Sequence, residues 1–567
     1  MVGVARDHIR QWQTMDLQLT AVLSLLEVVV LTGFQRAVDL AQTSPLTLIK
    51  AFFTHFLLQY GALKVYRVVI VPHYLSPLRH IPGPTNNFPL IGQMKNLLTA
   101  DSPSSLYVEW GNRWPDAPFI RHLGLANMEL LLVNTVEAHK EVFQTHAYDF
   151  IKPEFMYRYV ADISGRGLLF SEGEEHKRQR RSLGGLFSIP NLKRILPVFQ
   201  EKAGDLSAMF DREIGGNSKA TVEVQDAFSK LTMDVVGVTI LGVHLGNLNH
   251  TDPQMDFLKC FDRALNQPPL GALISFINTV VPIRRWLPIE ANRGFERATR
   301  EVRRMLLECV RQRSHDLDEA ARKKEAFVSA NLASGGRDLL TMMIEDRNKF
   351  RATTDEAPLT DEETVEHILN FLSAGHETTS GALTWAAFAL ATHPKVQDKL
   401  RLEITTLLST TTSPSYTDLE SLRYLHNFCR EVLRLYAPAF STYRQAARDL
   451  VICGQHIPKG TPLVGIMLVT NLSERVWGAD VTSFVPERWE EDRSPYAFST
   501  FMHGPRICVG KNYALLEFKA MLVEVLMKFR FGMTDELEAL GGKLPPLQNP
   551  SLSYRPRDGM RVVVERL

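Results

Sequence analysis

Residues 501–510 read Phe-Met-His-Gly-Pro-Arg-Ile-Cys-Val-Gly, and the apolar-periodic stretch 512–529 follows them directly. The pattern places Cys508 in a loop immediately before a helix. Gly504 and Gly510 bracket the cysteine and permit backbone angles and close approaches that other residues resist. We expect amide donors of the loop and of the helix start to lower the pKa of the thiol.

Three interpretations of Cys508 stay open on these residues alone. The thiol is buried and inert, or it is a nucleophile with His503 as its base, although no acyl-transfer motif accompanies the pair. In the third interpretation the thiolate is the axial ligand of a haem iron, and Arg506 adds a fixed positive charge nearby. The third requires further elements elsewhere in the chain, so those elements decide.

Composition excludes several classes of protein. The five cysteines are scattered and show no CxxC spacing, which excludes a disulfide framework and a cysteine-rich zinc site. The 64 Lys and Arg residues against 63 Asp and Glu leave a net charge of +1, far from the basic footprint of a nucleic-acid binder. We therefore expect no nucleic-acid partner.

Residues 1–75 differ from the rest and predict a membrane anchor. Segments 17–34 and 47–71 are apolar with polar interruptions, and a spanning helix needs about 20 mainly apolar residues. Basic residues and the helix-breaking run at 81–84 follow, which favours a cytosolic remainder. A pair of core helices is the alternative, and whether one segment or both span the membrane stays open.

Residues 76–567 predict one large domain that is mainly α-helical with small β-sheets. Helical patterns dominate between residues 192 and 436, residues 409–415 form a loop, and no repeat is visible. Short β-like runs lie near residues 131–133, 450–452 and 561–564.

One helical segment is long and has a weak centre. Thr360 and Glu363 form a capping box and His393-Pro394 ends the pattern, so about 32 residues without proline span roughly 48 Å. Residues 374–379 in its middle read Ala-Gly-His-Glu-Thr-Thr, a combination that lowers helix propensity. A weak spot in a strong element indicates function.

These motifs together resemble the cytochrome P-450 family. The pattern Phe-x-x-Gly-x-Arg-x-Cys-x-Gly at 501–510 matches the family's haem-binding loop, and residues 374–379 are similar to its oxygen-activation segment. Glu431-x-x-Arg434 matches its helix pair, and the run at 484–489 its meander segment. Four motifs in the family's order cover the chain from residue 82 to the C-terminus.

The resemblance implies a haem b cofactor whose iron is bound by Cys508. It also implies partners for the haem propionates: His176 and Arg180, which lie four residues apart on one helix face, with Arg444 and Arg506. Many family members carry tryptophan at the position of His176, so this sequence departs there. The remaining residues of the implied haem loop are Phe501, Gly504 and Gly510.

Two further groups follow from the resemblance. Glu431, Arg434 and Arg488 are implied to form a buried network that retains the cofactor, whereas an exposed pair would contribute little. Thr378 is implied to donate a hydrogen bond during oxygen activation and Glu377 to relay protons. The alternative for Thr378 is a helix hydroxyl bonded to its own backbone carbonyls.

The implied reaction inserts one atom of O2 into a lipophilic substrate, with electrons from NADPH through a separate NADPH-cytochrome reductase. Cytochrome b5 is a second candidate donor. The sequence resembles fungal members that tailor terpenoids or polyketides in secondary metabolism, and the apolar segments 150–169 and 254–287 resemble the family's substrate-recognition loops. We expect the endoplasmic reticulum membrane as the location, with the catalytic domain in the cytosol.

The type of reaction and the role of the basic residues around position 180 each have an alternative interpretation. A haem-thiolate isomerase or dehydratase would not use O2, and the intact Glu377-Thr378 pair disfavours it. A haem sensor or carrier would not need the long helix. Lys177, Arg178 and Arg181 either dock the reductase or only keep the helix soluble. Asn249 and Asn471 match glycosylation acceptors by chance.

Overall fold

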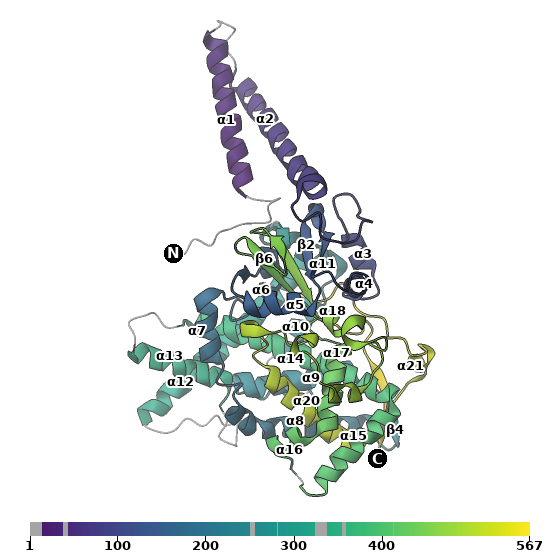
Figure 1. Cartoon of the computed structure of the whole chain (residues 1–567). Helices are drawn as coiled ribbons and strands as arrows, with labels where there is room; N and C mark the ends of the chain where they lie inside the picture. The colour runs from purple at the N-terminus through teal and green to yellow at the C-terminus, as the bar shows by residue number, and fades with distance from the viewer. Residues whose placement is uncertain are drawn as a thin grey trace. The chain divides into compact units, whose positions relative to one another are not determined.

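The computed structural model describes residues 14–37, 44–249, 256–280, 282–323, 337–353, 359–411 and 413–567. The chain forms two compact units, and each draws on several stretches of sequence (Figure 1). The first unit comprises Met1–Ala100, Ser105–Ile151 and Thr442–Ile466, and the second comprises Asp101–Ser104, Lys152–Ser441 and Met467–Leu567.

The first unit begins with two long apolar helices. Helix α1 spans Thr14–Ala37 and α2 spans Pro45–Val65, and α2 continues as the π-helical segment η1 at Tyr66–Leu75. Shorter helices follow at α3 (Met94–Thr99), α4 (Ser105–Arg113), η2 (Leu125–Asn127), α5 (Val136–Lys140) and η3 (Glu141–Thr145). Of the described residues, Pro45–Leu75 forms a helix long and apolar enough to cross a membrane.

A five-stranded sheet organises the rest of the first unit, in the order β1-β2-β8-β5-β3. Its strands are β1 (Phe119–Leu123), β2 (Glu129–Val133), β8 (Pro462–Ile466), β5 (Ser441–Ala446) and β3 (Phe150–Ile151). Strand β2 pairs with β8 in parallel, with Leu131 opposite Leu463. The hairpin β6 (Leu450–Ile452) and β7 (Gln455–Ile457) forms a separate two-stranded sheet. Strands β2, β6 and β10 (Arg561–Arg566) confirm the three predicted β-like runs.

The second unit is mainly helical. The long helices are α8 (Ile189–Ile214), α12 (Glu290–Lys323), α14 (Asp361–Thr392) and α20 (Lys511–Lys528). Helix α14 packs against α6 (Glu154–Ser164), α9 (Val224–Val236) and α12, and α20 packs against α8. The other helices are α6 (Glu154–Ser164), α7 (Gly173–Leu183), α9 (Val224–Val236), α10 (Phe257–Leu265), α11 (Pro269–Val280), α13 (Leu339–Thr353), α15 (Pro394–Leu408), α16 (Tyr416–Ser421), α17 (Arg423–Leu435), α18 (Met467–Asn471), α19 (Glu474–Trp477) and α21 (Asp535–Ala539).

A three-stranded antiparallel sheet, in the order β4-β10-β9, completes the second unit. Its strands are β4 (Lys219–Glu223), β10 (Arg561–Arg566) and β9 (Phe529–Gly532). The predicted class, mainly α with small β-sheets, is confirmed. The predicted loop at 409–415 lies between α15 and α16, and its residue 412 is outside the described part of the chain.

Candidate active site

Backbone hydrogen bonds close the cysteine loop before α20 begins. The Cys508 N–H donates to the Phe501 carbonyl at 2.8 Å, and the Ile507 N–H donates to the Gly504 carbonyl at 3.0 Å. Gly504 has a φ of +67°, in the left-handed region that favours glycine. Gly510 has a φ of −86°, which other residues adopt as well, so this glycine is not needed for its backbone angle.

The second glycine instead leaves space beside the sulfur. A Cβ built on Gly510 would lie 4.0 Å from the Cys508 sulfur and 3.7 Å from the Phe187 ring, and the Cys508 side chain is exposed. Cys508 keeps accessible surface, but protein atoms surround its thiol, and the resulting loss of hydration raises the pKa of the thiol against the lowering effects of the Gly510 N–H and of the Arg180 and Lys511 charges. The Gly510 N–H lowers the pKa of the Cys508 thiol, as the sequence predicted. The loss of hydration raises this pKa by more, so the predicted net lowering is wrong.

Arg506 joins the cysteine loop to the start of α7. Its Nη1 donates to the Ser171 carbonyl at 3.0 Å, and its guanidinium forms an ion pair with Glu172, the residue before the helix. Helix α7 carries His176, which is buried, and Arg180, which is half-buried. The structure thus brings three of the predicted propionate partners into one region, with side chains of the kind that bind carboxylates.

Arg444 lies in the first unit, on β5. Its Nη1 donates to the Thr442 hydroxyl at 2.8 Å and to the Tyr443 carbonyl at 2.7 Å. A role for Arg444 toward a haem propionate stays a prediction.

Helix α14 is continuous, and its predicted capping box is present. The Glu363 N–H donates to the Thr360 hydroxyl at 3.1 Å, and the Thr360 N–H donates to the Glu363 carboxylate at 2.8 Å. Ala374 is exposed and Thr378, one turn later, is half-buried, although most of the helix centre is buried. The Thr378 hydroxyl donates to the Ala374 carbonyl at 2.7 Å, the self-bonded arrangement named above as the alternative.

Phe187 links this part of α14 to the cysteine loop. Its ring centroid lies 5.5 Å from that of Phe371 on α14 and 6.0 Å from that of Tyr513 on α20. The same ring borders the space beside Gly510. We call the side of α14 that carries Ala374 and Thr378 its open face. The Cys508 sulfur and this open face therefore belong to neighbouring elements of the second unit.

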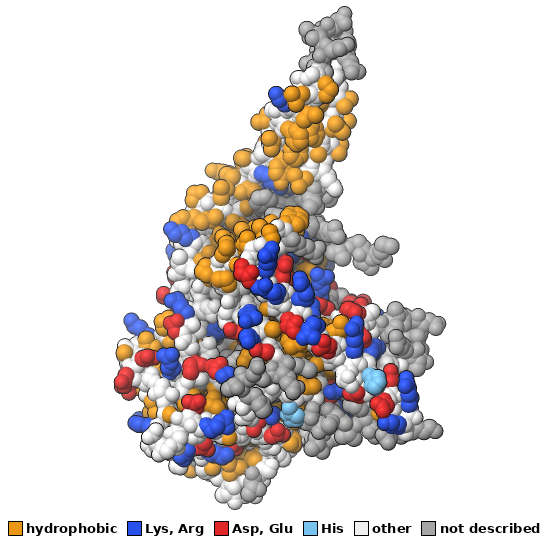
Figure 2. Space-filling view, turned by 180° about the vertical axis from the view of Figure 1, so that it is seen from behind, with side chains coloured by type: hydrophobic (Ala, Val, Ile, Leu, Met, Phe, Trp, Pro, Cys, Tyr) orange, Lys and Arg blue, Asp and Glu red, His pale blue; other side chains and the backbone are white. Residues whose placement is uncertain are grey.

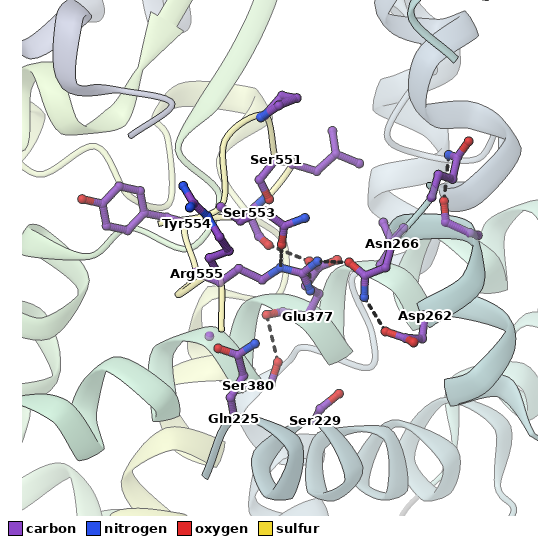
Figure 3. Close-up of a pocket in the computed structure, with 18 of the residues that line it drawn as sticks. Gln225, Ser229, Asp262, Asn266, Glu377, Ser380, Ser551, Ser553, Tyr554 and Arg555 are labelled. Atoms are coloured by element: carbon purple, nitrogen blue, oxygen red, sulfur yellow. Dashed lines mark hydrogen bonds and ion pairs between the residues drawn. The ribbon is translucent and has the colours of Figure 1, made fainter. Parts of the chain in front are cut away.

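Glu377 reaches a polar cavity of about 640 Å³ (Figure 3). Its Oε1 accepts a hydrogen bond from the Ser553 hydroxyl at 2.6 Å and lies 3.5 Å from Arg555 Nη1. Arg555 also donates to Asn266, the residue that follows α10, at 2.6 Å. Other polar residues that line the cavity are Gln225, Ser229, Asp262 and Ser380.

Sequence reasoning missed Ser553 and Arg555. They lie 176 and 178 residues after Glu377 (553 − 377 and 555 − 377), in a C-terminal segment without a recognisable motif. Only the fold brings this segment to α14, so no local signal could have identified it.

His503, the candidate base for a nucleophilic Cys508, is engaged elsewhere. Its Nε2 lies 3.3 Å from the Ser499 hydroxyl, and its ring lies 4.9 Å from that of Tyr496. Burial lowers the pKa of His503 to about 4. A neutral imidazole turned toward Ser499 gives no support to the nucleophile interpretation.

Glu431 is the centre of a buried network. Its Oε1 accepts from Arg434 Nη2 at 2.8 Å and Arg488 Nε at 2.9 Å, and its Oε2 accepts from Arg434 Nε at 2.9 Å and Trp489 Nε1 at 3.0 Å. Arg434 also donates to the carbonyl of Asn471. Asn471 is completely buried, so in this fold it cannot carry a glycan.

The residues around Cys508 fit a haem bound through sulfur. The thiol is exposed although protein surrounds it, glycine leaves room next to it, and α7 and the loop supply cationic or hydrogen-bonding groups for two carboxylates. A cysteine that serves only packing would not need this open space.

Comparison with known proteins decides the family. The model of the cytochrome P-450 family matches residues 82–550. The chain belongs to the cytochrome P-450 family. A cytochrome P-450 monooxygenase of Aspergillus fumigatus, sphH, is 30% identical, over 88% of this chain and 90% of its own length. FUM15 of Gibberella moniliformis is 28% identical (83% and 86% covered), and monooxygenase 205 of Postia placenta is 30% identical (85% and 91% covered). The chain is accordingly a P-450 monooxygenase, an oxidoreductase with a haem cofactor.

Proposed function

We propose that this cytochrome P-450 oxidises a lipophilic terpenoid or polyketide of secondary metabolism, with O2 as oxidant and NADPH as the source of electrons through a separate reductase. The observation that carries the proposal is the exposed Cys508 sulfur with free space at Gly510. The relatives named above are fungal monooxygenases, which supports the substrate class. When bound, haem supplies the activation of dioxygen.

One group of side chains is proposed to bind the cofactor, and a second group to deliver protons. Cys508 holds the cofactor, and His176, Arg180, Arg444 and Arg506 hold its carboxylates. The Glu431 network keeps the cysteine loop in place, because it ties α17 to the segment that carries Arg488.

The proposed proton path leads from the polar cavity to the open face of α14. Glu377 takes up a proton on the cavity side, where Ser553 and Arg555 orient its carboxylate. Thr378, the next residue, presents its hydroxyl on the open face and exchanges its bond to Ala374 for one to the reacting oxygen. The pair thereby delivers protons while the protein excludes bulk water.

The absorption spectrum of the reduced, carbon monoxide-bound protein tests the cysteine ligand. We expect the strongly red-shifted band of a thiolate-bound adduct in the wild type and its loss in Cys508→Ser. Cys453→Ser, which changes a half-buried cysteine between β6 and β7, should keep the band. Full haem loading without that band in the wild type would contradict the proposal.

Isotope labelling tests the reaction class. With NADPH, reductase and ¹⁸O2, one labelled atom should appear in the product and the other in water. An isomerase or dehydratase would form an unlabelled product without O2. Metabolite profiles of strains with and without the gene would identify the substrate, and a polar substrate would contradict the proposed class.

We also propose that the reductase docks on α7, with cytochrome b5 as an alternative donor to the same surface. Lys177, Arg178 and Arg181 are exposed there, although Lys177 and Arg178 pair with Glu174 and Glu175 on the same helix. Charge reversal at Lys177 and Arg181 should slow reductase-supported turnover and weaken its dependence on salt. Unchanged rates at every salt concentration would contradict docking on α7.

The proposed location is the endoplasmic reticulum membrane, with the catalytic units in the cytosol. The apolar helix Pro45–Leu75 supports it, since none of its most hydrophobic window is buried in the fold. Retention in the membrane fraction after alkaline carbonate washing tests the anchoring.

A further inference from the structure

Helices α1 and α2 pack side by side (Figure 1), with small and polar side chains between them and apolar side chains on the outside. On α1, Thr20, Ser24 and Val28 are 4, 0 and 8% exposed, and their spacing of four residues places them on one face. Large apolar side chains cover the outer faces (Figure 2). They are Leu17, Leu19, Val22, Leu23, Leu25, Leu26, Val29 and Val30 on α1 and Leu46, Ile49, Phe53, Leu57 and Leu58 on α2.

Polar side chains connect the two helices at mid-length. Glu27 Oε2 lies 2.9 Å from His55 Nδ1 and accepts a hydrogen bond from Gln59 Nε2. The Ser24 hydroxyl donates to Gln59 Oε1 at 3.3 Å. Residues 24 and 27 of α1 thus meet residues 59 and 55 of α2, which is an antiparallel register.

Water would favour the opposite arrangement. In a helix pair surrounded by water, apolar side chains face inward and polar ones outward. Small and polar residues at the helix interface, with leucine and valine outside, are the pattern by which helices associate in lipid. The outer apolar surface also exceeds the scattered single residues that soluble proteins expose.

Both helices are long enough to cross a bilayer. Helix α1 has 24 residues, which corresponds to about 36 Å against a hydrocarbon core of about 30 Å. Residues 17–34 contain a single charged side chain, Glu27, and its carboxylate bonds to His55 and Gln59 of α2. The sequence of α1 is therefore compatible with a membrane segment.

We propose that α1 and α2 cross the membrane together as a hairpin, so that the chain's N-terminus and residues 76–567 lie on the same side. The inference rests on the proposed membrane anchoring and adds the number of crossings. Lysine and arginine are more numerous in the sequence that flanks the open end of the hairpin than at its turn, which favours a cytosolic open end. The sequence on either side of the open end contains Arg6, Arg10, Lys64, Arg67 and Arg79, whereas the helix ends next to the turn contain Arg36 and Lys50.

Two reporters in the full chain, expressed in sealed microsomes, determine the topology. The first is an N-terminal extension with a glycosylation acceptor, and the second is Ser44→Cys, which lies at the turn before α2. The hairpin predicts an unmodified extension and an introduced thiol that a membrane-impermeant maleimide labels only after detergent is added. The wild-type chain gives the background labelling of its native cysteines.

Other results overturn the hairpin. A glycosylated extension would mean that a single helix crosses and that the N-terminus is lumenal. Labelling of Ser44→Cys without detergent would mean that α2 does not cross. If carbonate washing also removed the protein, the proposed anchoring itself would fail, whereas retention with either adverse result refutes only the hairpin.

Cross-linking tests the interface independently. A membrane-permeant bifunctional maleimide should join Ser24→Cys to Gln59→Cys, because these side chains are in contact. The matched pair Leu25→Cys and Leu58→Cys points outward from the same two helices and should react several-fold less. Equal cross-linking of both pairs would overturn the packed hairpin.

Discussion

Thr378 and Glu377 are adjacent in sequence but reach different surroundings. Glu377 bonds to Ser553 beside the polar cavity, and Thr378 lies on the open face of α14. Successive side chains of an α-helix point about 100° apart, so one peptide unit separates the two environments. In the proposed path, Glu377 takes up a proton on the cavity side and Thr378 delivers one on the neighbouring face.

Replacement of Thr378 by alanine tests the proposed donor. Haem content and substrate binding should be unchanged, but the yield of product per NADPH should fall about tenfold or more, with hydrogen peroxide formed instead. The matched control is Thr392→Ala, because Thr392 makes the same bond to the carbonyl four residues earlier, at 2.7 Å, but at the helix end. Coupling as tight as in the wild type would show that the Thr378 hydroxyl only satisfies its own helix.

A buried carboxyl group should give folding a pH dependence. Glu517 of α20 lies beside Thr379, and burial raises its pKa to about 8. Glutamate in an unfolded chain titrates near pH 4.3, so between these values the folded chain keeps a proton that the unfolded chain has lost. The free energy of unfolding therefore decreases as pH rises through this window and levels off above about pH 8.

Glu517→Gln should remove that dependence, because an amide stays neutral. Thermal unfolding of wild type and variant across the window should show the wild type losing stability relative to the variant, by up to about 1.4 kcal/mol per pH unit. Parallel curves for the two proteins would mean that Glu517 does not hold the extra proton.

At the scale of elements, two helices carry the same ion-pair spacing in opposite surroundings. Helix α17 pairs Glu431 with Arg434, and both side chains are completely buried. Helix α12 pairs Glu301 with Arg304, and these side chains are 44% and 54% exposed. Solvent screens the second pair, so it contributes little, whereas loss of one partner from the first leaves a charge without its counterion.

Glu431→Gln should accordingly destabilise the fold by about 3–5 kcal/mol and reduce haem retention. Glu301→Gln should change stability by less than about 0.5 kcal/mol. Chemical denaturation and haem content per chain measure both effects. If the two variants lost stability equally, the buried network would not be what holds the segment that carries Arg488.

Short sequence motifs predicted where helices and strands lie, but they could not predict contacts between residues that are far apart in the chain. The capping box at Thr360 placed the start of α14 correctly, because both bonds of the box lie within four residues. The same reasoning expected an unusual backbone angle or a close approach at Gly510, where the backbone angle is ordinary and an added Cβ would make only ordinary contacts. The balance between burial and nearby donors at Cys508 likewise depends on the whole fold.

The units of the whole molecule follow contacts rather than chain order. Residues 442–466 join the first unit although second-unit segments flank them on both sides, because β8 pairs with β2 more than 300 residues earlier (463 − 131 at the Leu131–Leu463 pair). Neither unit is continuous in sequence, so neither can be isolated by cutting the chain once. The N-terminal helices α1 and α2 form one end of the first unit's sequence, so their removal divides neither unit.

The contacts of η1 decide where the N-terminal helices can be cut from the chain. The predicted anchor, residues 1–75, includes η1, but Val68 and Pro72 of η1 are buried in the first unit. The side chain of Asn127 donates to the Val68 carbonyl at 2.9 Å, and that of Arg121 donates to the Pro72 carbonyl. We therefore expect a chain that begins at Tyr66 to keep the thermal stability and haem content of the full-length protein.

A chain that begins at Pro82 should be less stable, because each buried donor left without its acceptor costs about 1–3 kcal/mol. Val69, Ile70, Tyr74 and Leu75 of η1 remain exposed in the longer chain, so it should still bind vesicles weakly while the shorter one should not. Thermal unfolding and vesicle sedimentation of both truncations measure these differences. Equal melting temperatures would show that η1 belongs to the anchor rather than to the fold.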